Sequence, residues 1–344
     1  MTVVNFATIT IALLVLSGCA QKSKSPTQDV ITPDYLLSKG SKQLTFLGDN
    51  ERPRFSADGT KLLYVSRQRS SHKGAQVYEL DLVKNKERRV TFSDGDAFDP
   101  TYISDSEIIY ASTTDEIKEN PIANRTIDPK NPPSEIYMSD LFGGEILRLN
   151  VQPGYDAEPV FVAHDAKPYI LFSSHRGDLA GIYRLDLKNL PVSFLSVEKG
   201  KERRTPAVSP DNKQIAWIEK DLKTEEQSLV LFTLKGKISL VLKKGEGDYR
   251  DLFWSPRVPN RLFYSILRKG EKFYQIESLL METGCTQVVF KGSDSLIYPT
   301  LSNENPERLA FARVFQDKKQ IYMVPLPQDL GPCLAAPTQA TLKE

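Results

Sequence analysis

The sequence predicts an all-β fold: a six-bladed β-propeller of four-stranded antiparallel blades. Three observations support this prediction. A motif recurs about every 47 residues, strand signals follow one another in the same order inside each repeat, and helical hydrophobic stripes are absent over residues 42–326. The chain has 344 residues, 40% hydrophobic and 26% charged, with a formal net charge of +1. These values indicate a globular protein with a large core and argue against nucleic acid as the partner.

The recurring motif is clearest at residues 52–66, RPRFSADGTKLLYVS, a strand, a tight turn on Asp58-Gly59 and a second strand. The equivalent stretches are residues 99–112, 158–174, 205–219, 251–267 and 298–314. Their anchor positions, spaced by 47, 59, 47, 46 and 47 residues, are Pro53, Pro100, Pro159, Pro206, Leu252 and Pro299. A period of this size is typical of propellers and solenoids.

Each repeat continues with further strand signals rich in β-branched and aromatic residues. Third strands are expected at residues 76–82, 135–141, 181–187, 228–234, 273–279 and 320–326, and fourth strands at 88–92, 145–150, 192–197, 237–243 and 285–291. The sixth repeat ends at its third strand, whereas KQLTF (42–46) precedes the first repeat. We therefore expect this N-terminal strand to pair with residues 320–326 and close the ring. A strand near Thr338–Leu342 is the alternative.

The SxDGxxL, IYxxDL and LTF elements, in this order, resemble the repeats of TolB and Tricorn type propellers, also called PD40 or WD40-like repeats. The stretch SSHRGDLAGIYRLDL (173–187) matches the family's turn between second and third strands, so its Arg-Gly-Asp sequence is interpreted as a turn. The resemblance implies a protein-binding role, since TolB is a periplasmic partner of the lipoprotein Pal and of Tol proteins. TolB also carries an α/β domain before its propeller, and we expect that domain to be missing here.

Residues 1–18 are predicted to be a lipoprotein signal peptide. The apolar run FATITIALLVL (6–16) is about half the length that spans a bilayer, and it leads into LSGC (16–19). LSGC resembles the bacterial lipoprotein signal, which implies lipidation of Cys19, although MTVVN lacks the usual Lys or Arg. By resemblance to lipoprotein sorting of the enterobacterial type, Ala20 in place of Asp implies the outer membrane, facing the periplasm or the cell surface. Residues 19–41 are then a lipidated N-terminus and tether, and residues 327–344 a C-terminal tail.

The loops that enter each first strand lie on one propeller face, together with the loops between second and third strands. Six residues precede the anchors at equivalent positions and are expected to ring the channel mouth: Arg52, Asp99, Glu158, Thr205, Asp251 and Tyr298. With Arg204 they form the candidate ligand face, suited to a peptide, a sugar or, less readily, Ca²⁺ held by Asp99, Glu158 and Asp251. The alternative is a set of solvated turn residues. The arginines nearby favour a mixed-charge protein-binding surface.

Two further features concern loops and the tail. An insertion of about 12 residues within residues 113–134 belongs to the same face and is a candidate lid or partner arm, or else a tolerated excursion. Cys285 and Cys333 are expected on the opposite face, where an oxidising periplasm permits a disulfide; free thiols are the alternative.

Enzymatic function is not favoured by the sequence. No G-x-S-x-G motif is present, and His72, His164 and His175 lack paired metal-ligand spacing. We expect a lipid-anchored binding or scaffold protein without a cofactor, with the membrane and an envelope protein as partners. A carbohydrate-binding or lyase-like propeller and a structural envelope spacer are the alternatives, and a glycan ligand therefore stays open.

Overall fold

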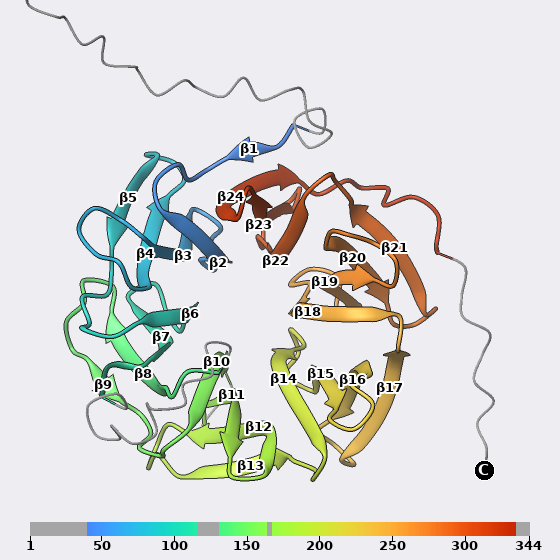
Figure 1. Cartoon of the computed structure of the whole chain (residues 1–344), viewed down its shortest axis with the longest axis horizontal. Coiled ribbons are helices and arrows are strands. Elements are labelled where there is room, and N and C mark those ends of the chain that lie inside the picture. The colour runs from blue at the N-terminus through green and yellow to red at the C-terminus, as the bar shows by residue number, and fades with distance from the viewer. Residues whose placement is uncertain (1–39, 116–130, 164–166, 335–344) are drawn as a thin grey trace, which may run out of the picture. The chain divides into compact units, whose positions relative to one another are not determined.

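The computed structural model describes residues 40–115, 131–163 and 167–334, and it confirms the predicted six-bladed β-propeller. Each blade is a four-stranded antiparallel sheet, and the blades follow one another around a central axis in chain order (Figure 1). In every blade the first strand lies nearest the axis and the fourth lies at the rim (Figure 1). In the part of the chain that is described, no helix is long and apolar enough to cross a membrane.

The strands have the following bounds. Blade 1 contains β2 (Asp49–Phe55), β3 (Lys61–Arg67), β4 (Gln76–Asp81) and β5 (Lys86–Arg89). Blade 2 contains β6 (Ala97–Tyr102), β7 (Glu107–Ser112), β8 (Glu135–Asp140) and β9 (Leu147–Arg148). Blade 3 contains β10 (Tyr155–Val162), β11 (Tyr169–Arg176), β12 (Leu179–Asp186) and β13 (Val192–Ser196). Blade 4 contains β14 (Lys201–Val208), β15 (Gln214–Asp221), β16 (Gln227–Thr233) and β17 (Ile238–Lys244). Blade 5 contains β18 (Gly247–Trp254), β19 (Arg261–Arg268), β20 (Gln275–Leu280) and β21 (Cys285–Phe290). Blade 6 contains β22 (Ser295–Leu301), β23 (Arg308–Phe315), β24 (Lys318–Pro325) and, at its rim, β1 (Lys42–Gln43).

The N-terminal strand closes the ring, as the sequence predicts. Strand β1 pairs antiparallel with β24, and the Leu44 N–H donates to the Ile321 carbonyl at 2.8 Å. The Thr45 hydroxyl extends this pairing, since its oxygen accepts the Ile321 N–H at 2.9 Å. Backbone hydrogen bonds therefore join the two ends of the propeller. The alternative closing strand, near Thr338–Leu342, lies outside the described residues.

The core lies between the blades. The described residues form six clusters of buried side chains, and each cluster is built mainly from two neighbouring blades. A sheet that is covered on both faces favours near-continuous apolar runs in place of strict alternation. Strand β3 shows this: Leu62 and Tyr64 pack towards blade 6, whereas Leu63 packs towards blade 2. The second strand of each blade accordingly has a continuous run of at least four buried residues.

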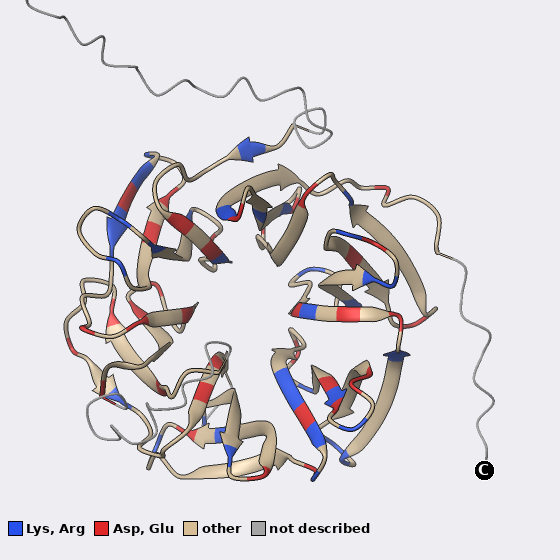
Figure 2. Cartoon of the chain, in the orientation of Figure 1, with Lys and Arg blue, Asp and Glu red and all other residues tan. Residues whose placement is uncertain are grey.

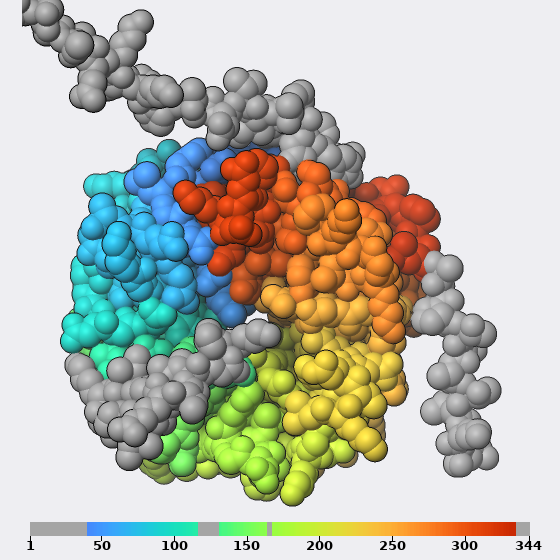
Figure 3. Space-filling model, in the orientation of Figure 1, coloured from blue at the N-terminus to red at the C-terminus, as the bar shows by residue number. Residues whose placement is uncertain are grey.

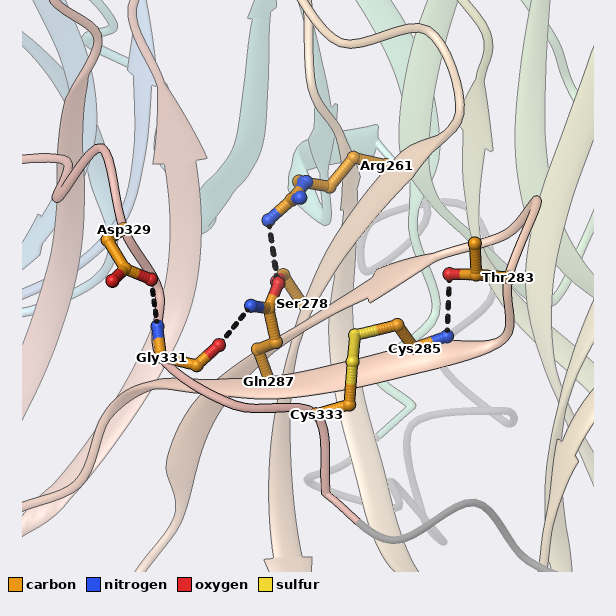
Figure 4. The surroundings of a disulfide bond; sticks show 8 residues. All are labelled: Arg261, Ser278, Thr283, Cys285, Gln287, Asp329, Gly331 and Cys333. Atoms are coloured by element: carbon orange, nitrogen blue, oxygen red, sulfur yellow. Dashed lines mark hydrogen bonds between the residues drawn. A yellow bond between two sulfur atoms is a disulfide. The ribbon is translucent and has the colours of Figure 1, made fainter.

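A disulfide fastens the C-terminal segment to the rim of blade 5. Cys285 and Cys333 are bonded, with their Cα atoms 5.2 Å apart (Figure 4). The Leu334 N–H donates to the Thr286 carbonyl at 2.6 Å. Gln287 Nε2 donates to the Gly331 carbonyl at 2.5 Å (Figure 4). Residues 331–334 therefore run along β21 and cover its outer edge.

Several sequence predictions fall outside the described residues. They concern the signal peptide, Cys19 and the tether (residues 1–39), most of the blade 2 insertion (116–130), His164 and the end of the tail (335–344).

Candidate functional site

A β-bulge in the innermost strand of every blade places one residue beside the central axis. In β2, Arg52 and Pro53 together oppose Tyr64, and the same irregularity recurs in the other five blades. The first bulged residue is left-handed each time, with φ between 52° and 60°. We call these six the ring residues: Arg52, Asp99, Glu158, Thr205, Asp251 and Tyr298. Because every blade repeats the conformation, it belongs to the blade architecture and does not by itself mark a site.

Each of the three carboxylates among the ring residues joins its own blade to the next. Asp99 Oδ2 accepts the Glu158 N–H at 3.1 Å, and Glu158 Oε2 accepts the Thr205 N–H at 2.8 Å. Asp251 Oδ2 accepts the Tyr298 N–H at 3.1 Å. The three N–H groups belong to bulged residues that have no register partner within their own sheet. A carboxylate from the preceding blade therefore satisfies a donor that the bulge leaves without a ladder acceptor.

Two arginines neutralise two of these carboxylates. Arg52 Nη1 lies 2.6 Å from Asp99 Oδ1, and the Arg52 guanidinium also lies 4.6 Å from the centroid of the Tyr298 ring. Arg204 Nη2 lies 3.0 Å from Glu158 Oε1, and its guanidinium covers the Tyr155 ring at 4.8 Å. Both arginines therefore hold neighbouring blades together.

The ring thus differs from the open polar funnel that the sequence predicts. The three carboxylates are buried, with Asp99 7%, Glu158 9% and Asp251 8% exposed. All three accept a backbone N–H from the next blade, and Asp99 and Glu158 also pair with arginines of the same chain. The described residues contain no group of three or more His, Cys, Asp or Glu side chains arranged to hold a metal ion. The candidate calcium site at Asp99, Glu158 and Asp251 is therefore not assembled.

Glu158 and Asp251 differ in their electrostatic surroundings. Burial raises the pKa of Glu158, but Arg204, Arg52 and a hydrogen bond from Ser173 more than offset it and bring that pKa to about 2. Burial also raises the pKa of Asp251, and the lowering by Arg52 and the Tyr298 N–H is incomplete, so the pKa reaches about 6. Asp251 lacks the close guanidinium that Glu158 has.

A cavity of about 1140 Å³ opens on the loop face. Ring residues of blades 1, 3, 4, 5 and 6 line its floor. The cavity then runs outward over blades 4 and 5. One side is lined by residues 224–227, which belong to the β15–β16 loop and the start of β16, and the other by residues 267–271, which belong to the end of β19 and the β19–β20 loop. The space-filling view shows the surface hollowed at the centre of the ring (Figure 3). A second cavity, of about 30 Å³, lies against the bulges and is lined by Arg54 and Asp99 among others.

The walls of the large cavity carry both signs of charge. Arg250 pairs with Asp248 at 3.3 Å, and Lys220 pairs with Glu225 at 3.2 Å. Lysines, arginines and carboxylates are interspersed along the inner strands, most visibly on β14 (Figure 2). Sequence reasoning missed this groove because its walls come from loops of two blades. Their placement depends on the blade packing, although both loops belong to the predicted ligand face.

The two described histidines have local partners. His72 Nε2 lies 2.9 Å from the Tyr78 hydroxyl, and His72 Nδ1 lies 2.8 Å from the Gly74 carbonyl. His175 Nε2 lies 3.2 Å from Glu202 Oε1, and its ring packs against Tyr155. His72 thus has its contacts within blade 1, whereas His175 of blade 3 contacts Glu202 of blade 4.

Solved structures with the same fold have varied activities. A scan against protein-family models and a search of curated proteins give no match. The chain is similar to an oligogalacturonate lyase in complex with manganese, with 14% identity and a TM-score of 0.57 over 83% of this chain and 80% of that chain. An oligogalacturonate lyase from Vibrio parahaemolyticus gives 12% identity and a TM-score of 0.56 over 85% and 94%. TolB from Acinetobacter baumannii gives 19% identity and a TM-score of 0.50 over 81% of this chain and 54% of TolB.

The chain therefore spans about half the length of that TolB, and at these identities the likeness concerns the fold. Lyases and TolB share the architecture, so the comparisons do not separate a binding protein from an enzyme. The resemblance seen in the sequence is confirmed at that level: the chain folds as a TolB-type six-bladed propeller.

Proposed function

We propose that this protein is a non-catalytic, lipid-anchored binding module of the bacterial cell envelope, which holds an extended segment of a partner protein in the large cavity of its loop face. The observation that carries this proposal is the cavity itself. Its volume of about 1140 Å³ slightly exceeds the roughly 300–1,000 Å³ usual for small-molecule sites. Its outward run between two loops suits a chain segment better than a compact metabolite.

The cavity walls favour a protein over a sugar. Closely spaced charges of both signs suit a polypeptide with its own charged side chains. Two aromatic rings of the lining, Tyr155 and Tyr298, have guanidinium groups over them. Those faces are therefore taken and do not offer the flat stacking surface that a sugar ring uses.

Site-specific photo-crosslinking in intact cells tests this proposal. A photoreactive amino acid is placed at Glu225 or at Lys269, on opposite walls of the cavity, and the control position is Lys235, an exposed residue of the β16–β17 turn. Lys235 lies in a turn between third and fourth strands, which is on the opposite face of the propeller. We expect the same partner protein to be captured from Glu225 and Lys269 and not from Lys235. Equal capture from all three positions, or capture from none, contradicts the proposal; envelope polysaccharides would then be tested as ligands.

The lipid anchor rests on the sequence pattern at residues 6–19. Metabolic labelling with a palmitate analogue tests it. We expect label in the wild-type protein and none in Cys19→Ser, together with a shift of the protein from the outer-membrane fraction to the soluble or inner-membrane fraction. If the wild-type protein is not labelled, the lipid anchor is wrong, and the proposed binding of a partner in the cavity is unaffected.

A further inference from the structure

The strongest unexplained feature of the ring is Asp251. Its carboxylate is 8% exposed, and the hydrogen bond described for it comes from the Tyr298 N–H. No cation of the described residues lies within 4.0 Å of it. Burying a carboxylate without a counter-ion costs free energy, so a cation bound beside Asp251 would be stabilising.

The approximate sixfold symmetry shows where such a cation belongs. Asp99, an aspartate at the equivalent position, is paired at 2.6 Å with Arg52, the ring residue of the preceding blade. The ring residue that precedes Asp251 is Thr205, 46 positions earlier. A threonine is too short to repeat the contact that Arg52 makes. Among the described residues, no guanidinium forms the equivalent ion pair with Asp251 at the junction of blades 4 and 5.

Thr205 itself gives an independent indication. Its hydroxyl oxygen is buried and has no hydrogen-bond partner among the described residues. Buried hydroxyls are normally satisfied, by protein or by a ligand. An unsatisfied hydroxyl and an unpaired carboxylate thus belong to consecutive ring positions, and both line the large cavity.

The positive groups nearby are already engaged. Arg52 is bound to Asp99, and Arg250 pairs with Asp248 and lies over the Tyr274 ring at 4.7 Å. Arg54 lines the small cavity, where its Nη1 donates to the Pro53 carbonyl at 3.0 Å. Asp251 and Thr205 line that small cavity too, but they also line the large cavity, whose lining does not include Arg54 and which gives a new cation access to Asp251.

We propose that the cavity receives an arginine side chain of the partner, whose guanidinium lies between Thr205 and Asp251. It pairs with the Asp251 carboxylate and donates to the Thr205 hydroxyl, in the place that corresponds to the Arg52 guanidinium beside Asp99 at the junction of blades 1 and 2. This inference rests on the proposed function, because it names the group by which the partner segment is held. Arginine is favoured over lysine because the equivalent place in the ring is filled by a planar guanidinium.

The test uses short glycine-rich peptides with one central arginine, and the same peptides with citrulline, which keeps the shape and loses the charge. Binding to the soluble chain from residue 20 is measured by calorimetry or NMR titration. We expect the arginine peptide to bind at least tenfold more tightly than the citrulline peptide. Asp251→Asn should reduce arginine binding at least tenfold, whereas Asp178→Asn, which removes an exposed charge from a loop of the same face, should leave it within twofold.

A second variant places the arginine in the chain itself. Thr205→Arg is compatible with the backbone, because Arg52 adopts φ 56° at the equivalent position and Thr205 has φ 52°. We expect this variant to lose arginine-peptide binding and to have a higher melting temperature than wild type, since its own guanidinium pairs with Asp251. Equal binding of the arginine and citrulline peptides, no binding of either, or unchanged binding in both variants overturns the inference.

The two proposals fail separately. If Thr205→Arg still crosslinks the same partner from Lys269 at the wild-type level, the arginine site is wrong and the partner-binding cavity stands. If no partner is captured in cells, but the arginine peptide binds and both variants weaken that binding, the arginine site is supported and the proposed envelope function is wrong.

Discussion

Removal of the Cys285–Cys333 disulfide should destabilise the propeller by about 4 kcal/mol. The bond joins residues 48 positions apart, and the loop-entropy relation gives about 3 kcal/mol for a 15-residue loop and about 4.7 for a 100-residue loop. For a domain of this size, about 2 °C of melting temperature corresponds to 1 kcal/mol, so the loss is about 8 °C. The assay is urea and thermal unfolding of Cys285→Ser combined with Cys333→Ser. The double variant avoids the free thiol that either single change leaves.

Reduced wild-type protein is the matched control and should unfold with the double variant. A loss below about 1 kcal/mol would refute the loop-entropy reasoning. It would mean that the unfolded chain gains little freedom from the cut, or that residues 327–334 are already loose in the folded state. Proteolysis separates these cases, because a loose tail is cleaved near Gly331 while the bond is intact.

Three further predictions concern the ring and its closure. Arg52→Met leaves the buried carboxylate of Asp99 unpaired and should cost roughly 3–5 kcal/mol in urea unfolding; a loss below 1 kcal/mol would show that this ion pair is not structural. Asp251 has a folded pKa of about 6 against 3.8 for an ordinary aspartate, so the folded state holds the proton more tightly and stability from this group falls as the pH rises from about 4 to about 6. Asp251→Asn should therefore have a higher free energy of unfolding than wild type at pH 7.5, by up to about 3 kcal/mol, and the two should be equal near pH 4. Burial also raises the pKa of Asp156 to about 6, but Asp156 titrates in both proteins and cancels in the comparison. A stability difference that does not change with pH would contradict the assignment to Asp251. Thr45→Val removes two hydrogen bonds at the closing strand and should cost about 1–3 kcal/mol, with faster proteolysis at residues 40–47; unchanged stability would show that β1 is dispensable for closure.

The fold was predictable because each blade repeats one local code. A turn such as Asp58-Gly59 sets the first hairpin, and an apolar run such as LLYV follows it. The displaced strand at residues 42–46 could be assigned by counting alone, since five repeats have four strand signals and the sixth has three. The structure shortens that strand to Lys42–Gln43, and the Leu44 and Thr45 hydrogen bonds continue the pairing.

The ring positions were equally predictable, and their environment was not. Spacing identifies Asp99 and Glu158 as equivalent residues, but it does not show that a bulge points them at the N–H of the next blade. Burial of these carboxylates depends on the packing of two separate sheets, which a single repeat does not encode. The groove over blades 4 and 5 escaped for the same reason, since the β15–β16 and β19–β20 loops approach each other across a blade junction.

The junction between blades 4 and 5 differs from the other blade junctions in its ring contacts. Contacts between ring residues join five of the six pairs of neighbouring blades. The Arg52 guanidinium joins blade 1 to blade 2 through Asp99 and to blade 6 through the Tyr298 ring. A carboxylate that accepts a backbone N–H joins blades 2 and 3, blades 3 and 4, and blades 5 and 6. Thr205 makes no such contact with Asp251 among the described interactions, and the large cavity runs outward over these same two blades. A short ring residue thus coincides with the open side of the cavity. A partner that supplies the cation there gains the ion pair and joins the remaining pair of blades, so its binding should also stabilise the folded ring.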